Sequence, residues 1–195
     1  MSQRPLVLAS SSPYRRALLE RLMVDFECIS PDIDESQAPN ESPIELVRRL
    51  AVEKAQAIAK QRPTALIIGS DQVAVHNGQI VGKPHTHERA VEQLKQASGQ
   101  RVDLFTGLAL VDAVSGDVQS DVVRFSTHFK PLSETVIEHY LVKEQPYDCA
   151  GSLKSEGLGI ALLERFEGDD PTALIGLPLI RLVDLLENAG FSLWD

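Results

Sequence analysis

An apolar stretch over residues 65–75 constrains the fold of this 195-residue chain more than any other feature. Its Leu, Ile, Val and Ala residues have the pattern of a buried strand, with a polar interruption at Asp71. Asn77 and Gly78 follow, the pair preferred in a two-residue type I′ turn, and a second apolar segment starts at Ile80. These residues predict a β-hairpin, so the sheet cannot be wholly parallel.

Two helix starts are marked by side chains that suit the first turn of a helix. A short apolar segment over residues 6–9 leads into three serines, and Ser12 before Pro13 predicts a capped helix directly after a strand. Ser42 and Glu45 stand at the spacing of a capping box, which predicts a second helix that continues to about residue 60.

The rest of the chain continues this alternation of strand and helix patterns. The predicted elements are strands over 102–111 and 118–129, helices over 86–99, 133–142 and 178–188, and a glycine-rich loop with a strand over 150–166. Interleaved elements of this kind predict an α/β fold in which helices flank a mixed sheet. No repeat or linker divides the sequence, so we expect one domain over residues 1–195.

The composition excludes several classes of protein. With 43% hydrophobic and 24% charged residues the chain can bury a full core, and no apolar run approaches the ~20 residues that span a bilayer. The apolar segment near the N-terminus is too short for a signal peptide, so we expect a cytoplasmic protein. Two distant cysteines, Cys28 and Cys149, do not suit a disulfide framework. A net charge of −9 disfavours long nucleic acid and anionic membranes as partners.

Two charged residues interrupt apolar patterns and are candidates for a functional site. Lys54 lies on the same predicted helix face as Leu50 and Ile58, so it either extends to the edge of that face or points at a buried anion. Asp71 interrupts a strand in which an isolated carboxylate is costly to bury. It is either bonded to backbone amides or placed in a cleft, and the neighbouring Gly69 favours the cleft because glycine permits close approach of another group.

Further polar residues form a combination typical of metal-assisted phosphoryl chemistry. The turn with Ser10 and Arg15 presents N–H groups that suit an anion, although a plain capped helix explains the same residues. Lys83 follows the hairpin, and in an ideal register it faces away from Asp71, so a bulge or a bend at residues 82–84 would be needed to bring the two together. With Glu35 as a second acid, these groups suit a polyphosphate, a divalent cation and an attacking water.

Several segments, taken in order, resemble the Maf family of nucleotide pyrophosphatases. They are LASSSPYRRALL at 8–19, DIDE at 32–35, LAxxKA at 50–55, GSDQV at 69–73, GKP at 82–84, SG at 98–99 and TG at 106–107. The matches extend over essentially the whole chain. The resemblance implies a fold related to inosine triphosphatases, in which a long twisted mixed sheet supports two lobes with the active site in the cleft between them.

The same resemblance implies an activity, a cofactor and residue roles. The activity is hydrolysis of a nucleoside triphosphate to the monophosphate and pyrophosphate with a divalent cation, Mg²⁺ or Mn²⁺, and the family suggests a homodimer. Asp71 matches the proton acceptor for the attacking water, and with Glu35 it matches the metal-binding acids. The residues that match phosphate-binding positions are Ser10, Arg15, Lys54 and Lys83.

Three positions sort substrates within the family, and here they are Tyr14, Gln72 and Glu156. This combination is similar to the 7-methyl-GTP pyrophosphatase branch. Methylation at N7 makes guanine cationic, so the Tyr14 ring gains a cation–π contribution of ~0.5–2 kcal/mol. The Glu156 carboxylate can accept two N–H groups of guanine, whereas uracil or thymine would present carbonyl oxygens to it. A solvated loop residue is the alternative interpretation of Glu156.

Two other functions stay open at this point. The chain could hydrolyse dTTP, UTP or another modified nucleotide by the same reaction. It could also be a nucleotide-binding regulator of cell division or septum formation, a role with which the family is associated. The presence of Asp71, Glu35, Lys54 and Lys83 argues against an inactive member.

Overall fold

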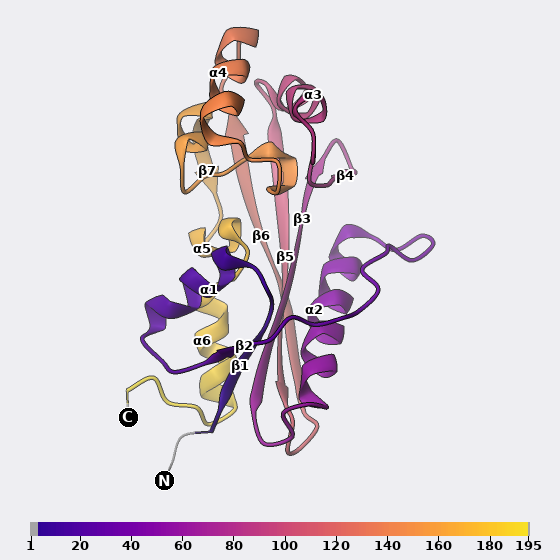
Figure 1. The fold of residues 1–195 in the computed structure, drawn as a ribbon, viewed down its shortest axis with the longest axis vertical. Helices are drawn as coiled ribbons and strands as arrows, with labels where there is room; N and C mark the ends of the chain where they lie inside the picture. The colour runs from indigo at the N-terminus through magenta and orange to yellow at the C-terminus, as the bar shows by residue number, and fades with distance from the viewer. Residues whose placement is uncertain (1–3, 195) are drawn as a thin grey trace.

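The computed structural model describes residues 4–194, in which seven strands form one mixed sheet flanked by helices (Figure 1). The strand order is β2-β1-β3-β5-β6-β7, and β4 pairs with β3. The strands are β1 Leu6–Ala9, β2 Glu27–Cys28, β3 Leu66–His76, β4 Gln79–Val81, β5 Arg101–Asp112, β6 Val118–Phe129 and β7 Leu163–Glu167. The predicted α/β class is confirmed. Of the predicted domain over 1–195, residues 1–3 and 195 lie outside the described part.

The predicted hairpin forms between β3 and β4. Asn77 and Gly78 adopt positive φ angles of 49° and 75°, as a type I′ turn requires, and His76 pairs with Gln79. On its two edges β3 pairs in parallel with β1 and in antiparallel with β5. The sheet is therefore mixed, and β3 is the strand on which both pairing modes meet.

The helices begin at the caps that the sequence indicates. Ser12 caps α1, Ser42 and Glu45 form the capping box of α2, and the Thr86 side chain caps α3. The helices are α1 Pro13–Leu19, α2 Pro43–Ala59, α3 His87–Ala97, α4 Glu134–Glu144, α5 Pro171–Ile175 and α6 Leu179–Asn188. None of the helices within residues 4–194 is long and apolar enough to cross a membrane.

The structure differs from the predicted order of helices and strands in its short elements. Neither the two-residue strand β2 nor the five-residue helix α5 was predicted, because elements of one turn or one residue pair carry no periodicity. In the segment over 150–166 the strand is confined to β7, and two short 3₁₀ helices, Ala150–Ser152 and Leu158–Leu162, precede it.

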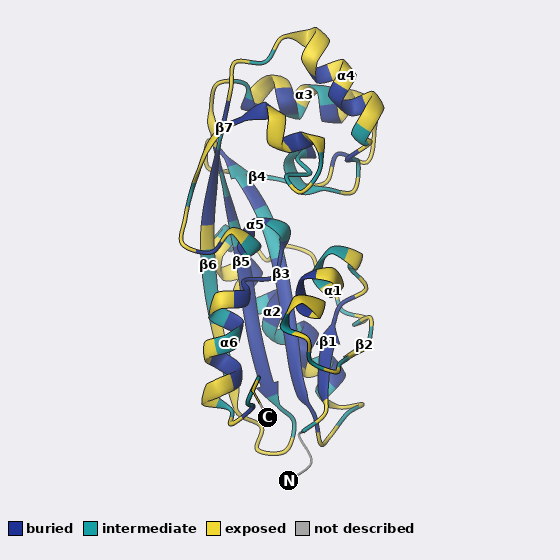
Figure 2. Cartoon of the chain, turned by 90° about the vertical axis from the view of Figure 1, so that its left-hand side faces the viewer, coloured by how far each residue is buried: buried dark blue, intermediate teal, exposed yellow. Residues whose placement is uncertain are grey.

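Two groups of helices share the long strands β3, β5 and β6 (Figure 1). In the half that holds both chain ends, α2 covers one face of the sheet, and α1 and α6 cover the opposite face. At the other end α3 and α4 pack with β7 and the ends of β5 and β6. Figure 2 shows β1, β3 and β5 largely buried between these helices, and each group of helices packs around hydrophobic cores of its own.

Two glycines let α2 lie unusually close to the sheet. A Cβ atom at Gly69 would stand 2.0 Å from the carbonyl oxygen of Ala51, and one at Gly107 would stand 2.0 Å from that of Val47. Gly107 pairs directly with Asp71 across β3 and β5. The missing side chains therefore set the distance between the α2 backbone and the part of the sheet that carries Asp71.

We expect Gly69→Ala to lower the free energy of unfolding by about 3 kcal/mol, because the added methyl group collides with a helix backbone that cannot move away freely. Urea unfolding measures this loss. Gly82→Ala is the matched control, since a Cβ there would have no heavy atom within 4 Å and the backbone is not left-handed. Equal stability of the two variants would contradict the packing argument.

Candidate active site

A cavity of about 600 Å³ opens beside the middle of β3. Its walls come from the turn between β1 and α1, the loop before α2, α2 itself, β3, the segment after β4 and residues 148–156. All nine predicted site residues line it: Ser10, Tyr14, Arg15, Glu35, Lys54, Asp71, Gln72, Lys83 and Glu156. Segments that are far apart in the sequence thus contribute to one site.

Lys54 pairs with two acids, the buried Asp71 and the exposed Glu35. Its Nζ donates to Asp71 Oδ1 at 2.7 Å and lies 3.0 Å from Glu35 Oε1. Lys54 is 5% exposed and Asp71 is 8% exposed, so the ammonium points at a buried anion and does not extend to the edge of its helix face. The ammonium compensates for the desolvation of the Asp71 carboxylate, which would otherwise be costly to bury.

The turn between β1 and α1 is held by hydrogen bonds of its own and by α5. The buried Ser10 accepts the backbone N–H of Ser12 on its Oγ at 3.1 Å. Ser12 Oγ in turn accepts the backbone N–H of Arg15, and Arg15 Nε donates to the carbonyl oxygen of Gly176 at 2.8 Å. The Arg15 guanidinium is therefore fixed at the wall of the cavity.

The charge of Arg15 lies near the two acids that pair with Lys54. Burial lowers the pKa of Arg15, whereas the charges of Asp71 and Glu35 raise it. An arginine in such surroundings stays protonated. Arg15 and Lys54 therefore place two positive charges near two carboxylates, an arrangement that suits the combined binding of phosphates and a cation.

The segment after β4 carries Lys83, which lines the same cavity as Asp71. β4 ends at Val81, so the ideal hairpin register does not continue to Lys83. The carbonyl oxygen of Gly82 accepts the backbone N–H of Gly151 at 3.3 Å, which ties this segment to the 3₁₀ helix beside the cavity. Lys83 and Asp71 therefore line the same cavity beyond the end of the hairpin ladder.

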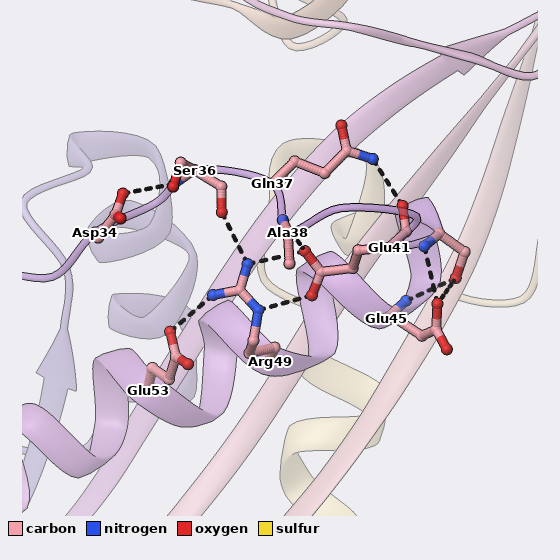
Figure 3. A network of polar contacts seen from close by, with 9 residues as sticks. Asp34, Ser36, Gln37, Ala38, Glu41, Glu45, Arg49 and Glu53 are labelled. Carbon is pink, nitrogen blue, oxygen red and sulfur yellow. Dashed lines mark hydrogen bonds and ion pairs between the residues drawn. The ribbon is translucent and has the colours of Figure 1, made fainter.

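Arg49 fastens the loop that carries Glu35 to α2 (Figure 3). Its guanidinium donates to the two Glu41 oxygens at 2.7 and 2.9 Å, to Glu53 at 3.0 Å and to the carbonyl oxygen of Ser36 at 2.9 Å. The hydrogen bonds from Arg49 lower the pKa of Glu41 to about 2. Because Ser36 follows Glu35 directly, this anchor fixes where Glu35 enters the cavity.

A second group of cavity residues combines an aromatic ring, a thiol and two carboxylates. Tyr14 donates its hydroxyl to Asp148 Oδ2 at 3.3 Å, and burial, with Cys149 and Asp148 nearby, raises the pKa of Tyr14. Burial also raises the pKa of Cys149 to about 12, and the charges of Asp148 and Glu156 add to this effect. The thiol is therefore protonated at neutral pH. The negative charges of Asp148 and Glu156 both lie close enough to Cys149 to affect it.

Gln72 lines the cavity, but its amide nitrogen is bound to α5 and β5. Nε2 donates to Thr106 Oγ1 at 2.9 Å and to the carbonyl oxygen of Ala173 at 2.6 Å. Consecutive strand residues face opposite sides of a sheet, so Gln72 and Asp71 diverge from β3. The structure thus places Gln72 at the cavity through a tie to α5.

Three residues at or beside the cavity were missed in the sequence. Ser70 Oγ lies 2.9 Å from the Gly176 carbonyl oxygen, and Thr106 Oγ1 donates to that of Ala173 at 2.8 Å. Both stand beside Gly or Asp residues in recognised segments, and their position in those segments was the only signal in the sequence. Asp148 carries no motif, because only the fold brings it to Tyr14.

Two carboxylates at the cavity could hold a divalent cation. Across residues 4–194 there is no group of three or more His, Cys, Asp or Glu side chains placed to hold a metal ion. Glu35 and Asp71 nevertheless both lie beside Lys54, and Mg²⁺ is commonly bound by one or two carboxylates together with substrate phosphates. The donor set fits a divalent cation whose remaining ligands come from a bound polyphosphate.

Comparison with known proteins gives consistent matches over the chain. A family model described as "Maf-like protein" matches residues 5–189. A "7-methyl-GTP pyrophosphatase" of Pseudomonas syringae pv. tomato is 60% identical, over 96% of this chain and 97% of the relative. A protein of the same name from Nitrosococcus oceani is 58% identical, over 95% and 94%. Among solved structures, the Ham1 protein of Staphylococcus aureus matches with a TM-score of 0.47 and 16% identity, over 65% of this chain and 72% of that one.

We expect Lys54→Met to lower the free energy of unfolding by about 3 kcal/mol, because Asp71 then loses its buried counter-ion. Adding Asp71→Asn to the same chain should restore part of the loss, with a coupling of about 1–3 kcal/mol in a double-mutant cycle. Urea unfolding supplies all four free energies. Lys60→Met, at an exposed position beyond the end of α2, is the control and should be nearly neutral. Strictly additive effects of the two cavity substitutions would argue against the buried pair.

Proposed function

Because the chain belongs to the family of Maf-like proteins, we propose that it hydrolyses 7-methyl-GTP to 7-methyl-GMP and pyrophosphate. The observation that carries this proposal is the single cavity that all nine candidate residues line. Relatives named 7-methyl-GTP pyrophosphatase are 56–60% identical to this chain over nearly their full length, which supports the choice of substrate.

The triphosphate is bound by the positive wall of the cavity. The Ser10 hydroxyl and the N–H groups at the start of α1 suit phosphate oxygens, and Arg15 and Lys83 add two positive charges. Lys54 contributes a third cation from α2. A chain with a net charge of −9 can thus bind a polyanion through a local concentration of cations.

Asp71 is the proton acceptor in this mechanism. Water attacks the α-phosphorus and forms a new P–O bond, while the bond from this phosphorus to the bridging oxygen breaks and pyrophosphate leaves with the electron pair. The water proton passes to the Asp71 carboxylate. Lys54 holds Oδ1 of that carboxylate at 2.7 Å and so fixes its orientation toward the substrate.

A divalent cation, Mg²⁺ or Mn²⁺, is part of the proposal. Glu35 and Asp71 are the residues that would hold it, together with phosphate oxygens of the substrate. When bound, the cation supplies positive charge that offsets the charge of the reacting phosphates. Lys54 already occupies the space between the two acids, so we assign to it the same neutralising role on the protein side.

The base is recognised by the second group of cavity residues. The Tyr14 ring offers its face to the cationic methylated guanine, a contact of ~0.5–2 kcal/mol. Glu156 accepts hydrogen bonds from the N1–H and N2–H groups of guanine, a pairing that uracil and thymine cannot make. Gln72, the third specificity position, acts through its bonds to α5 and keeps that helix against the cavity wall.

We also propose how the molecule is organised in the cell. Residues 1–195 act as one domain of two lobes, and the cavity lies between the helix groups that share β3 and β5. A cytoplasmic location suits a nucleotide substrate and two free, half-buried cysteines. A homodimer remains the expected assembly, and light scattering of the purified chain measures it.

The test is pyrophosphate release in Mg²⁺ and in Mn²⁺ from a panel of 7-methyl-GTP, GTP, ITP, dTTP and UTP. We expect 7-methyl-GTP to give the highest kcat/KM, because it alone combines a positive charge with the guanine hydrogen-bonding edge. A preference for dTTP or UTP would keep the reaction and overturn the assignment of Glu156. Binding without turnover across the whole panel would replace the enzyme with a nucleotide-binding regulator.

A further inference from the structure

Asp148 is a cavity residue to which neither the motifs nor the proposed mechanism gives a role. It lies in the segment between α4 and the 3₁₀ helix at Ala150–Ser152, and it lines the cavity together with Tyr14 and Glu156. Its Oδ2 accepts the Tyr14 hydroxyl at 3.3 Å. The Asp148 carboxylate is therefore hydrogen-bonded to Tyr14, whose ring the proposed function places against the base.

The surroundings of Asp148 concentrate negative charge. The charges of Asp148 and Glu156 both act on the thiol of Cys149, which lies between them in the chain and at the cavity wall. Lys154 lies two residues before Glu156, and its ammonium is engaged by Glu144 at 2.7 Å. The positive charge of Arg15 interacts instead with the carboxylates of Asp71 and Glu35. The second group of cavity residues thus carries two carboxylates and no cation of its own, and Lys83 lies on the neighbouring segment that is hydrogen-bonded to Gly151.

Two acids are more than the hydrogen-bonding edge of guanine requires. Glu156 alone can accept both N–H groups of that edge. A second carboxylate bonded to the tyrosine hydroxyl gives no further hydrogen bond to a neutral base, but its charge attracts a base that is itself positive. The arrangement therefore distinguishes the methylated from the unmethylated base by charge.

We propose that Asp148 is a specificity-determining residue that favours a positively charged purine over its neutral counterpart. This inference rests on the proposed function and goes beyond it, because it assigns the discrimination between 7-methyl-GTP and GTP to a carboxylate outside the recognised positions. Asp148 acts by its charge and, through its hydrogen bond, by holding the Tyr14 ring in place.

The experiment measures kcat/KM for 7-methyl-GTP and for GTP in the wild-type chain and in Asp148→Asn. Asparagine can still accept the Tyr14 hydroxyl but carries no charge. We expect the ratio of the two kcat/KM values to fall about three- to tenfold, as suits one partly solvated charge close to a cationic base. The loss should lie in the 7-methyl-GTP value, with that for GTP nearly unchanged.

Three further variants separate charge from packing. Asp148→Glu keeps the charge and should retain most of the ratio, whereas Tyr14→Phe keeps the ring and the carboxylate and removes only their hydrogen bond. Glu164→Gln removes one exposed charge on β7 outside the cavity, so it controls for the change in net charge. Raising the salt concentration should reduce the ratio in the wild type more than in Asp148→Asn, because screening acts on the charge that the variant lacks.

The outcomes distinguish this inference from the function on which it rests. If the wild type prefers 7-methyl-GTP and Asp148→Asn has the same ratio of kcat/KM values as the wild type, the role of Asp148 alone is overturned. An equal loss of kcat/KM for both nucleotides is one way in which this result would arise. A wild type that prefers dTTP or UTP would overturn the proposed substrate and this inference with it. A reduced ratio in Asp148→Asn that Asp148→Glu restores supports the inference.

Discussion

The close contact between α2 and the sheet is the constraint on which the rest of the site depends. Without side chains at Gly69 and Gly107, the backbone of α2 reaches the strands at distances that a single Cβ would forbid. Lys54 projects from this helix directly onto the carboxylate of Asp71, at 2.7 Å. A carboxylate in the middle of a buried strand is tolerable only because this helix delivers its counter-ion.

The opposite face of the sheet fixes the turn between β1 and α1 by a separate set of contacts. Arg15 Nε and Ser70 Oγ both lie within hydrogen-bonding distance of the Gly176 carbonyl oxygen, at the end of α5. Gln72 and Thr106 bind the carbonyl oxygen of Ala173 in the same helix. α5 is only five residues long, yet it connects the turn, β3 and β5 at the edge of the cavity.

Local signals made most of the fold predictable from the sequence. The turn at Asn77 and Gly78 and the caps at Ser12 and Ser42 depend on the chemistry of neighbouring residues, and all were found where expected. The elements that were missed, β2 and α5, are too short to show a period. Asp148 could not be found because its relation to Tyr14 exists only across 134 residues of chain. Interrupted apolar patterns marked Lys54 and Asp71, whereas Tyr14, Gln72 and Glu156 came from the resemblance to a family, and all of them line one cavity.

Asp71 links the packing to the proposed chemistry, so its substitution is the most direct measurement. In Asp71→Asn we expect turnover of 7-methyl-GTP to fall by a factor of about 10²–10⁴, the range of general-base catalysis. Affinity for the nucleotide, measured by calorimetry, should stay within a few-fold of the wild type, because Arg15 and Lys83 are unchanged. Turnover at the wild-type rate would contradict the assignment of Asp71 as proton acceptor.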